Sequence, residues 1–189
     1  TLKSQIDLLT ELGKNETNVT KGKLELPVLT ANNNLPLSSA QERLWFIYKM
    51  DPGNISFNLV QGIHIKGKVN LSYLKDAWEL IIERHKILRS IFKETENGPV
   101  IQISDRNNFS CNIIDLSSVK NSFNNVESLI VKEARKPFDL CKGPLFRVNI
   151  YQISPSDTYF VLFIHHIICD GWSMSVWVKV LVTVPSADT

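Results

Sequence analysis

Residues 158–173 read Thr158-Tyr159-Phe160-Val161-Leu162-Phe163-Ile164-His165-His166-Ile167-Ile168-Cys169-Asp170-Gly171-Trp172-Ser173. The part through Ile164 is apolar and predicts a buried strand, which pairs with a preceding strand predicted over 145–153. Two histidines at the end of such a strand need partners, because burying an unpaired polar group costs free energy. Adjacent strand residues point to opposite faces, so one histidine is expected to face the core or a neighbouring layer and the other a cleft.

Strand and helix patterns alternate along the rest of the sequence. Ser39 and Glu42 have the spacing of a capping box, which indicates the start of a helix that runs to about Met50. Apolar side chains at helical spacing, Trp78 among them, predict a second helix over 70–88. The other predicted elements are a helix over 126–136 and strands over 57–66, 89–93 and 100–103. This mixture indicates an α/β or α+β layer architecture.

The composition bounds the class of protein. The chain has 189 residues, of which 43% are hydrophobic, and this suits one domain or one lobe of a larger one. The net charge, 21 − 19 = +2, gives no electrostatic argument for binding nucleic acid or an anionic membrane. The longest apolar run, Tyr159–Ile164, has six residues, whereas a membrane span needs about 20.

Cysteine usage and the first residues point to a cytoplasmic protein. The three cysteines are few and odd in number, which argues against a disulfide framework, and the N-terminus lacks the apolar core of a secretory signal. A zinc site needs three or four converging ligands. Two histidines on opposite faces of a strand do not provide them, so no metal site is expected.

Three motifs, in order, resemble those of nonribosomal peptide synthetase condensation domains. Residues 165–171, His-His-Ile-Ile-Cys-Asp-Gly, resemble the HHxxxDG signature. Residues 37–45, Leu-Ser-Ser-Ala-Gln-Glu-Arg-Leu-Trp, resemble the opening SxAQxRLW motif. Residues 84–92, Arg-His-Lys-Ile-Leu-Arg-Ser-Ile-Phe, resemble RHxxLRTxF, with Ser90 where threonine is usual. Related acyltransferases carry HxxxD alone, so the order of all three motifs makes the resemblance specific.

The resemblance implies a fold, a reaction and partners. The fold would be an α/β (α+β) lobe like that of chloramphenicol acetyltransferase, with a mixed sheet flanked by helices, and only the first of two lobes is present. The reaction would form an amide bond between a donor acyl or peptidyl thioester and the amino group of an acceptor aminoacyl thioester. Both substrates would ride on phosphopantetheine arms of upstream and downstream peptidyl carrier domains, so no cofactor is expected to bind the chain directly.

Carried over position by position, the resemblance implies that His166 is the catalytic histidine and that His165 is structural. Gly171 is expected to permit a tight turn and a close approach of backbone to substrate. Trp172 and Ser173 are expected beside the mouth of the substrate tunnel. An α-amino group has a pKa of about 7.7–8.0, so His166 would only need to orient the amine and accept its proton as the tetrahedral intermediate forms.

Asp170 resembles a structural anion of the family rather than a catalytic acid. Its expected partner is Arg89, which begins a predicted strand, with Arg84 as the second choice. A buried carboxylate without its arginine costs about 3–5 kcal/mol. Asp170→Ala and Arg89→Ala are therefore expected to give mainly misfolded protein.

The resemblance covers residues 35–178, which would form the N-terminal lobe. Residues 1–34 are expected to be a linker or the remnant of a preceding segment, and residues 179–189 an atypical C-terminal tail. The missing C-terminal lobe would supply the opposite wall of the tunnel, so this chain alone is expected to show little or no condensation activity.

Two other functions stay open. One is a related HxxxD acyltransferase that uses a small thioester donor, although the opening motif argues against it. A coenzyme A-dependent acylation assay distinguishes this function. The other is a non-catalytic carrier-binding fragment, for which carrier binding would be unaffected by His166→Ala.

Overall fold

The computed structural model describes residues 34–104, 111–119, 122–171 and 173. Its centre is a four-stranded sheet in the order β2-β7-β6-β5. β7 lies antiparallel to β2 and β6, whereas β5 lies parallel to β6, so the sheet is mixed as expected. The bounds are β2 Asn58–Lys66, β5 Cys111–Asp115, β6 Phe146–Ser154 and β7 Asp157–His165.

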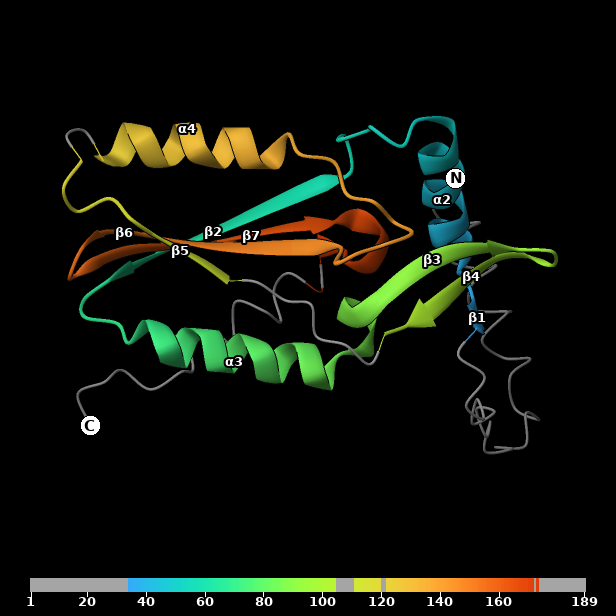
Figure 1. Cartoon of the computed structure of the whole chain (residues 1–189), viewed down its shortest axis with the longest axis horizontal. Helices are drawn as coiled ribbons and strands as arrows, with labels where there is room; N and C mark the ends of the chain where they lie inside the picture. The colour runs from blue at the N-terminus through green and yellow to red at the C-terminus, as the bar shows by residue number, and fades with distance from the viewer. Residues whose placement is uncertain (1–33, 105–110, 120–121, 172, 174–189) are drawn as a thin grey trace, which may run out of the picture. The chain divides into compact units, whose positions relative to one another are not determined.

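The β6–β7 hairpin forms the buried middle of this sheet, and the prediction of a strand pair here is confirmed. Every residue of 160–164 is at most 2% exposed. Such an unbroken apolar run is typical of a strand that is covered on both faces. Figure 1 shows the two covering helices, α3 (Leu71–Arg84) on one side of the sheet and α4 (Ser122–Ala134) on the other.

Helix α3 packs its apolar face on the sheet. Trp78 is fully buried, and its ring contacts those of Phe146 and Phe160 at centroid distances of 5.8 and 5.9 Å. The side chain of Asn70 caps the helix by accepting from the backbone N–H of Ser72 at 3.0 Å. The helical pattern in the sequence extends to residue 88, but the helix ends at Arg84 and a short 3-10 helix, η1 (Lys86–Arg89), follows.

Helix α2 (Ser39–Met50) has the predicted extent, but its capping box lies one residue earlier. Ser38 is the N-cap, and its hydroxyl accepts from Gln41 N at 3.3 Å while Gln41 Oε1 accepts from Ser38 N at 3.0 Å. The predicted pairing of Ser39 with Glu42 is therefore wrong. Both serines fit the capping pattern, and the extended backbone at Ser38 (φ −74°, ψ 159°) decides between them.

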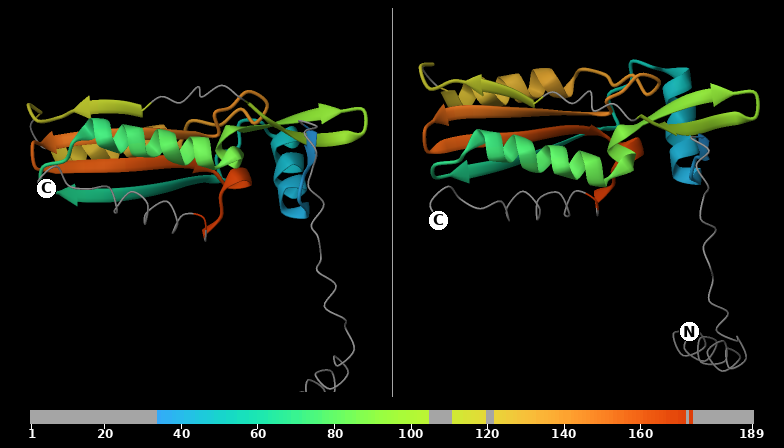
Figure 2. Two further views of the ribbon diagram at one scale, coloured as in Figure 1. Left: turned by 90° about the horizontal axis from the view of Figure 1, so that it is seen from below. Right: turned by 60° about the horizontal axis from the view of Figure 1, so that its bottom comes forward.

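A second, antiparallel sheet has the order β1-β4-β3, with bounds Asn34–Pro36, Gly98–Ile103 and Ser90–Thr95. Both views in Figure 2 show the β3–β4 hairpin beside α2, beyond the end of the larger sheet. The sequence predicts the two strands of this hairpin but not β1, in which Asn34, expected as the last linker residue, pairs with Gln102. Gly98 has φ 104°, a left-handed conformation that suits glycine at this tight connection.

Strand β5 is also absent from the sequence prediction. It runs parallel to β6, and a parallel pair needs a crossover connection, which α4 supplies. Residues 1–33 of the expected linker, Trp172 and the expected tail over 179–189 lie outside the described residues. Within the described part of the chain, no helix combines the length and the apolar character that crossing a membrane requires.

Candidate active site

The two histidines lie where the central strand β7 ends. His165 is the last residue of β7 and pairs in register with Asn58 of β2. His166 begins the 3-10 helix η2 (His166–Ile168), which therefore sits at the end of the sheet that faces α2. The buried strand β7 fixes the backbone position of both histidines, since it is paired with β2 on one side and β6 on the other.

His165 points into the protein interior. The residue is 4% exposed, and its ring lies 6.4 Å from that of Phe57 and 6.2 Å from that of Phe138, between centroids. Its Nδ1 accepts a hydrogen bond from the backbone N–H of Ile167 at 3.1 Å. This bond assigns the proton of the neutral ring to Nε2. The buried histidine thus has a hydrogen-bond partner, as expected from the cost of burying an unpaired polar group.

His165 makes the stability of the fold depend on pH. Burial, together with the charge of the neighbouring His166, lowers the pKa of His165 from 6.5 to about 4. Between these pH values the unfolded chain binds this proton and the folded chain does not. The free energy of unfolding therefore falls as the pH drops from about 6.5 to about 4, by an amount on the order of 3 kcal/mol.

This pH dependence can be measured by denaturant unfolding at several pH values between about 7 and about 4. The matched variant is His165→Asn, because asparagine Oδ1 can still accept from the Ile167 N–H but does not titrate. We expect the variant to lose less stability on acidification than the wild type. If both proteins lose the same amount, His165 is not the group responsible.

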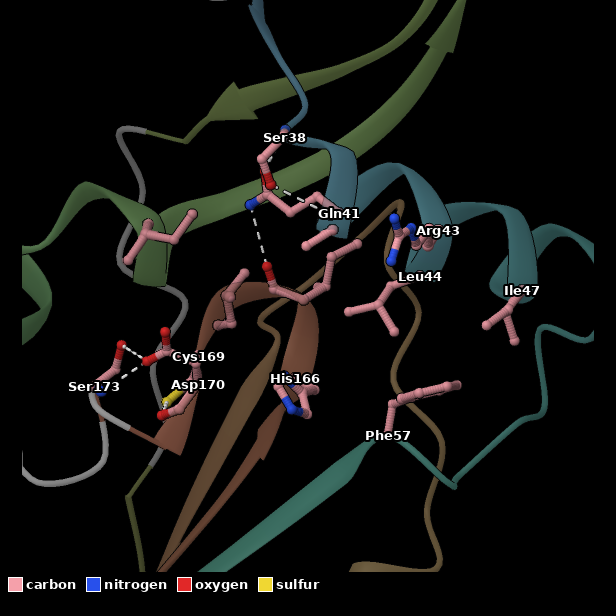
Figure 3. A pocket seen from close by; sticks show the side chains of 14 residues that line it. Ser38, Gln41, Arg43, Leu44, Ile47, Phe57, His166, Cys169, Asp170 and Ser173 are labelled. Carbon is pink, nitrogen blue, oxygen red and sulfur yellow. Dashed lines mark hydrogen bonds between the residues drawn. The ribbon is translucent and has the colours of Figure 1, made fainter. Parts of the chain in front are cut away.

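His166 has the opposite surroundings. It is exposed, and its backbone N–H donates to the carbonyl of Phe57 at 2.9 Å while its own carbonyl accepts from Cys169 N at 3.3 Å. The backbone of the turn is thus anchored, and no hydrogen bond to the imidazole is found among the described residues. Figure 3 shows the His166 ring in a pocket, with side chains of α2 on the other side.

This pocket has a volume of about 570 Å³. One wall is α2 as far as Ile47, with its cap, and the other is η2 with the residues that follow it. Phe57 and Ile87 complete the lining. Most of the lining is apolar, with a few polar groups, as is usual for sites that bind small organic ligands. The residues that α2 and its cap contribute are Ser38, Ala40, Gln41, Arg43, Leu44 and Ile47.

Asp170 does not form the expected ion pair with Arg89 in the described part of the chain. Asp170 is exposed, and its Oδ1 accepts from the backbone N–H and the hydroxyl of Ser173 at 2.8 and 2.6 Å. These bonds lower the pKa of Asp170 below its ordinary value. Arg89 instead donates to the carbonyl of Ser104 at 2.8 Å, and Arg84 is exposed on α3. The expectation that Asp170 is a buried carboxylate paired with an arginine is therefore wrong.

The physical reason is the position of Arg89 next to its own hairpin. It precedes β3, and its carbonyl accepts from Ser104 N at 2.9 Å just beyond the end of β4. Ser104 therefore lies directly opposite Arg89 across the hairpin, within reach of the Arg89 side chain. Since the carboxylate of Asp170 is solvated, the expected misfolding of Asp170→Ala no longer follows from burial.

Gly171 and Ser173 follow Asp170 in the turn. Gly171 does not have a positive φ, and a Cβ built on it meets no heavy atom of the described residues within 4 Å. Its close approach to substrate stays a prediction. Ser173 lines the pocket and donates to Asp170, whereas Trp172 lies outside the described residues.

Sequence reasoning misses two contributors to the site. Phe57, predicted as the first residue of a strand, lines the pocket and anchors His166 through its carbonyl. Gln41 stands out in the sequence only as part of a motif, yet its side chain reaches the histidine turn by donating to the Ile167 carbonyl at 3.2 Å. Among the described residues, no group of three or more His, Cys, Asp or Glu side chains forms a candidate metal site.

Comparison with known proteins places this geometry in context. The family model described as "Condensation domain" matches residues 31–184. A linear gramicidin synthase protein of Brevibacillus parabrevis is 33% identical over 161 residues, which are 84% of this chain and 3% of the synthase. Bacitracin synthase 3 of Bacillus licheniformis is 33% identical over 145 residues, which are 76% of this chain and 2% of that protein.

Solved structures agree in fold. The starter condensation domain of rhizomide synthetase has a TM-score of 0.75 at 22% identity, over 80% of this chain and 38% of that chain. The first condensation domain of the calcium-dependent antibiotic synthetase, solved with a substrate analogue, has a TM-score of 0.74 at 22% identity, over 82% of this chain and 40% of that chain. This chain thus spans a small part of the curated relatives and well under half of each solved chain.

Proposed function

This chain belongs to the condensation-domain family of nonribosomal peptide synthetases, and we propose accordingly that it supplies the histidine-bearing lobe of an amide-forming site. The site would join a donor acyl or peptidyl thioester to the amino group of an acceptor aminoacyl thioester. The observation that carries the proposal is the difference in environment between the two histidines. His166 opens into the pocket from the end of β7, and His165 is buried behind it.

The proposed step is an aminolysis in which His166 handles one proton. The neutral amine attacks the thioester carbonyl carbon, and the imidazole of His166 accepts the proton from nitrogen as the tetrahedral intermediate forms. The intermediate then collapses, the carbon–sulfur bond breaks, and the departing sulfur takes up the proton as a thiol. General base help of this kind contributes about 10²–10⁴-fold, and holding both tethered substrates in one pocket adds to it.

His165, Asp170 and Ser173 would act indirectly. His165 supports the turn through Ile167, and Asp170 and Ser173 hold each other at the far end of it. Trp172, Ser173 and Gly171 are proposed to lie beside the path of the substrates, as the family resemblance implies. Arg89 and Arg84 are proposed as supporting residues, Arg89 at the start of the β3–β4 hairpin and Arg84 at the end of α3.

The proposed substrates arrive on phosphopantetheine arms of an upstream and a downstream carrier domain. In support, a starter condensation domain with this fold was solved in complex with C8-CoA and Leu-SNAC. A second lobe would close the pocket over His166, which fits the coverage of 38–40% of two solved chains. None of the three cysteines, all of which are among the described residues, forms a disulfide, and we propose that the protein works in the reducing cytoplasm.

The test uses a protein that contains this chain together with the proposed second lobe, here called the full-length protein. It is mixed with two carrier domains, one bearing a donor thioester and one bearing an aminoacyl thioester. We expect a new amide on the acceptor carrier, detected by intact-protein mass spectrometry, and little or no product from the 189-residue chain alone. Acyl transfer from coenzyme A to a free acceptor, without carrier-bound product, would indicate the related acyltransferase instead. Carrier binding without turnover would indicate a binding fragment.

A further inference from the structure

Gln41 connects helix α2 to the histidine turn through a single side-chain amide. Its Oε1 accepts from the backbone N–H of Ser38 at 3.0 Å, and its Nε2 donates to the carbonyl of Ile167 at 3.2 Å. Ser38 is the N-cap of α2, whereas Ile167 lies in η2, far away in the sequence. Figure 3 shows both bonds as dashed lines that meet at Gln41. Both ends of this amide are therefore engaged by backbone groups.

The Ile167 carbonyl is one of several backbone groups that hold the turn around His166. The His166 N–H donates to Phe57 O at 2.9 Å, and the Ile167 N–H donates to His165 Nδ1 at 3.1 Å. These two bonds hold the turn from the side of the sheet. The bond from Gln41 holds it from the side of α2, which is the opposite wall of the pocket.

We propose that Gln41 is a positioning residue: it fixes the Ile167–Ile168 peptide, one residue beyond His166, and so holds the imidazole at a defined distance from the α2 wall. This inference rests on the proposed function for His166. A small displacement of a catalytic group from its reactive geometry lowers the rate steeply. Gln41 acts on the reaction through the turn, and its loss reduces the rate of the chemical step more than it reduces substrate binding.

The chemistry of the amide makes the proposal testable with a nearly isosteric change. Gln41→Glu keeps an oxygen that accepts from the Ser38 N–H, so the cap of α2 survives. A carboxylate has no N–H to donate, and it places an oxygen against the Ile167 carbonyl. Gln41→Met removes the same donor without adding a charge, and it also removes the oxygen that accepts from the Ser38 N–H. A change that both variants share therefore reflects loss of the bond to Ile167, since only Gln41→Glu adds a charge near His166 and only Gln41→Met disturbs the cap.

The experiment uses the chain labelled on its four histidines for NMR, and the full-length protein for kinetics. We expect the imidazole signals of His166, assigned by their absence in His166→Ala, to move in Gln41→Glu and in Gln41→Met. In the carrier assay we expect kcat to fall about 10- to 100-fold in both variants, with KM for the acceptor within about twofold of the wild type. The control is Asn70→Ala, which removes the cap of α3 and should leave both readouts unchanged.

The proposal is overturned if His166 keeps its wild-type signals in both Gln41 variants, or if KM rises while kcat is unchanged. It is also overturned if Asn70→Ala lowers kcat as much as the Gln41 variants do, since general loss of helix stability would then explain the effect. The NMR measurement needs no turnover. If the wild-type protein forms no amide, the proposed function fails, and the inference about Gln41 is decided by the imidazole signals.

Discussion

Replacing His166 by alanine is expected to lower kcat for amide formation by about 10²–10⁴-fold. His166 is exposed at the pocket and its structural bonds use its backbone, so the substitution removes the imidazole and leaves the turn in place. Some activity should remain, because an acceptor amine is partly neutral at pH near 7.7–8.0 and the two substrates are still held together. The residual rate should differ between acceptor amines.

The matched control is His64→Ala. His64 lies on β2 of the same sheet, six positions along the strand from Asn58, the register partner of His165. At about 3.3 Å per residue it sits about 20 Å along the strand from the site. We expect kcat to be unchanged in this variant and the thermal unfolding of His166→Ala to match the wild type. A His166→Ala protein that retains full turnover would contradict the proposed catalytic role.

Replacing Trp78 by alanine is expected to lower the free energy of unfolding by about 3–5 kcal/mol. The Trp78 ring is fully buried between α3 and the sheet, against Phe146 and Phe160. Its removal leaves a cavity that a covered, close-packed layer cannot fill by relaxing. Because folded domains are only about 5–15 kcal/mol more stable than their unfolded chains, this loss removes a large share of the stability of the fold. Denaturant unfolding followed by circular dichroism measures the change.

Leu80 offers a control on the same helix, because it is 66% exposed. Leu80→Ala also removes apolar side-chain atoms, yet it should change the free energy of unfolding by no more than about 0.5 kcal/mol. An equal loss of stability in both variants would mean that the loss comes from the helix itself and not from packing of α3 on the sheet.

Much of the fold follows from local patterns. The apolar run of β7 indicates a strand that is buried on both faces. The apolar side chains at helical spacing around Trp78 indicate a helix with one buried face. The separation of His165 from His166 is predictable for the same kind of reason. Alternation along a strand sends adjacent side chains to opposite sides, and the structure buries His165 and exposes His166.

Local sequence patterns do not predict an element correctly when two residues fit the pattern equally well, or when a strand distant in the sequence decides the structure. Ser38 and Ser39 both fit a capping box, and the backbone entering α2 selects Ser38. Strands β1 and β5 are short edge strands, and their residues carry little pattern of their own. They become strands because β4 and β6 present free hydrogen-bonding edges beside them.

The family and the order of the main strands and helices can be read from the amino-acid sequence, because periodicity and motif spacing are properties of neighbouring residues. Strand alternation separates the two histidines, and only the family resemblance indicates that His166 is the one facing the pocket. The partners of long polar side chains are set only when the chain folds. Arg89 bonds Ser104 rather than Asp170, and Gln41 reaches Ile167 across the pocket. A flexible side chain can meet any acceptor that folding brings within its reach, so its partner depends on how α2, the β3–β4 hairpin and the end of β7 pack together.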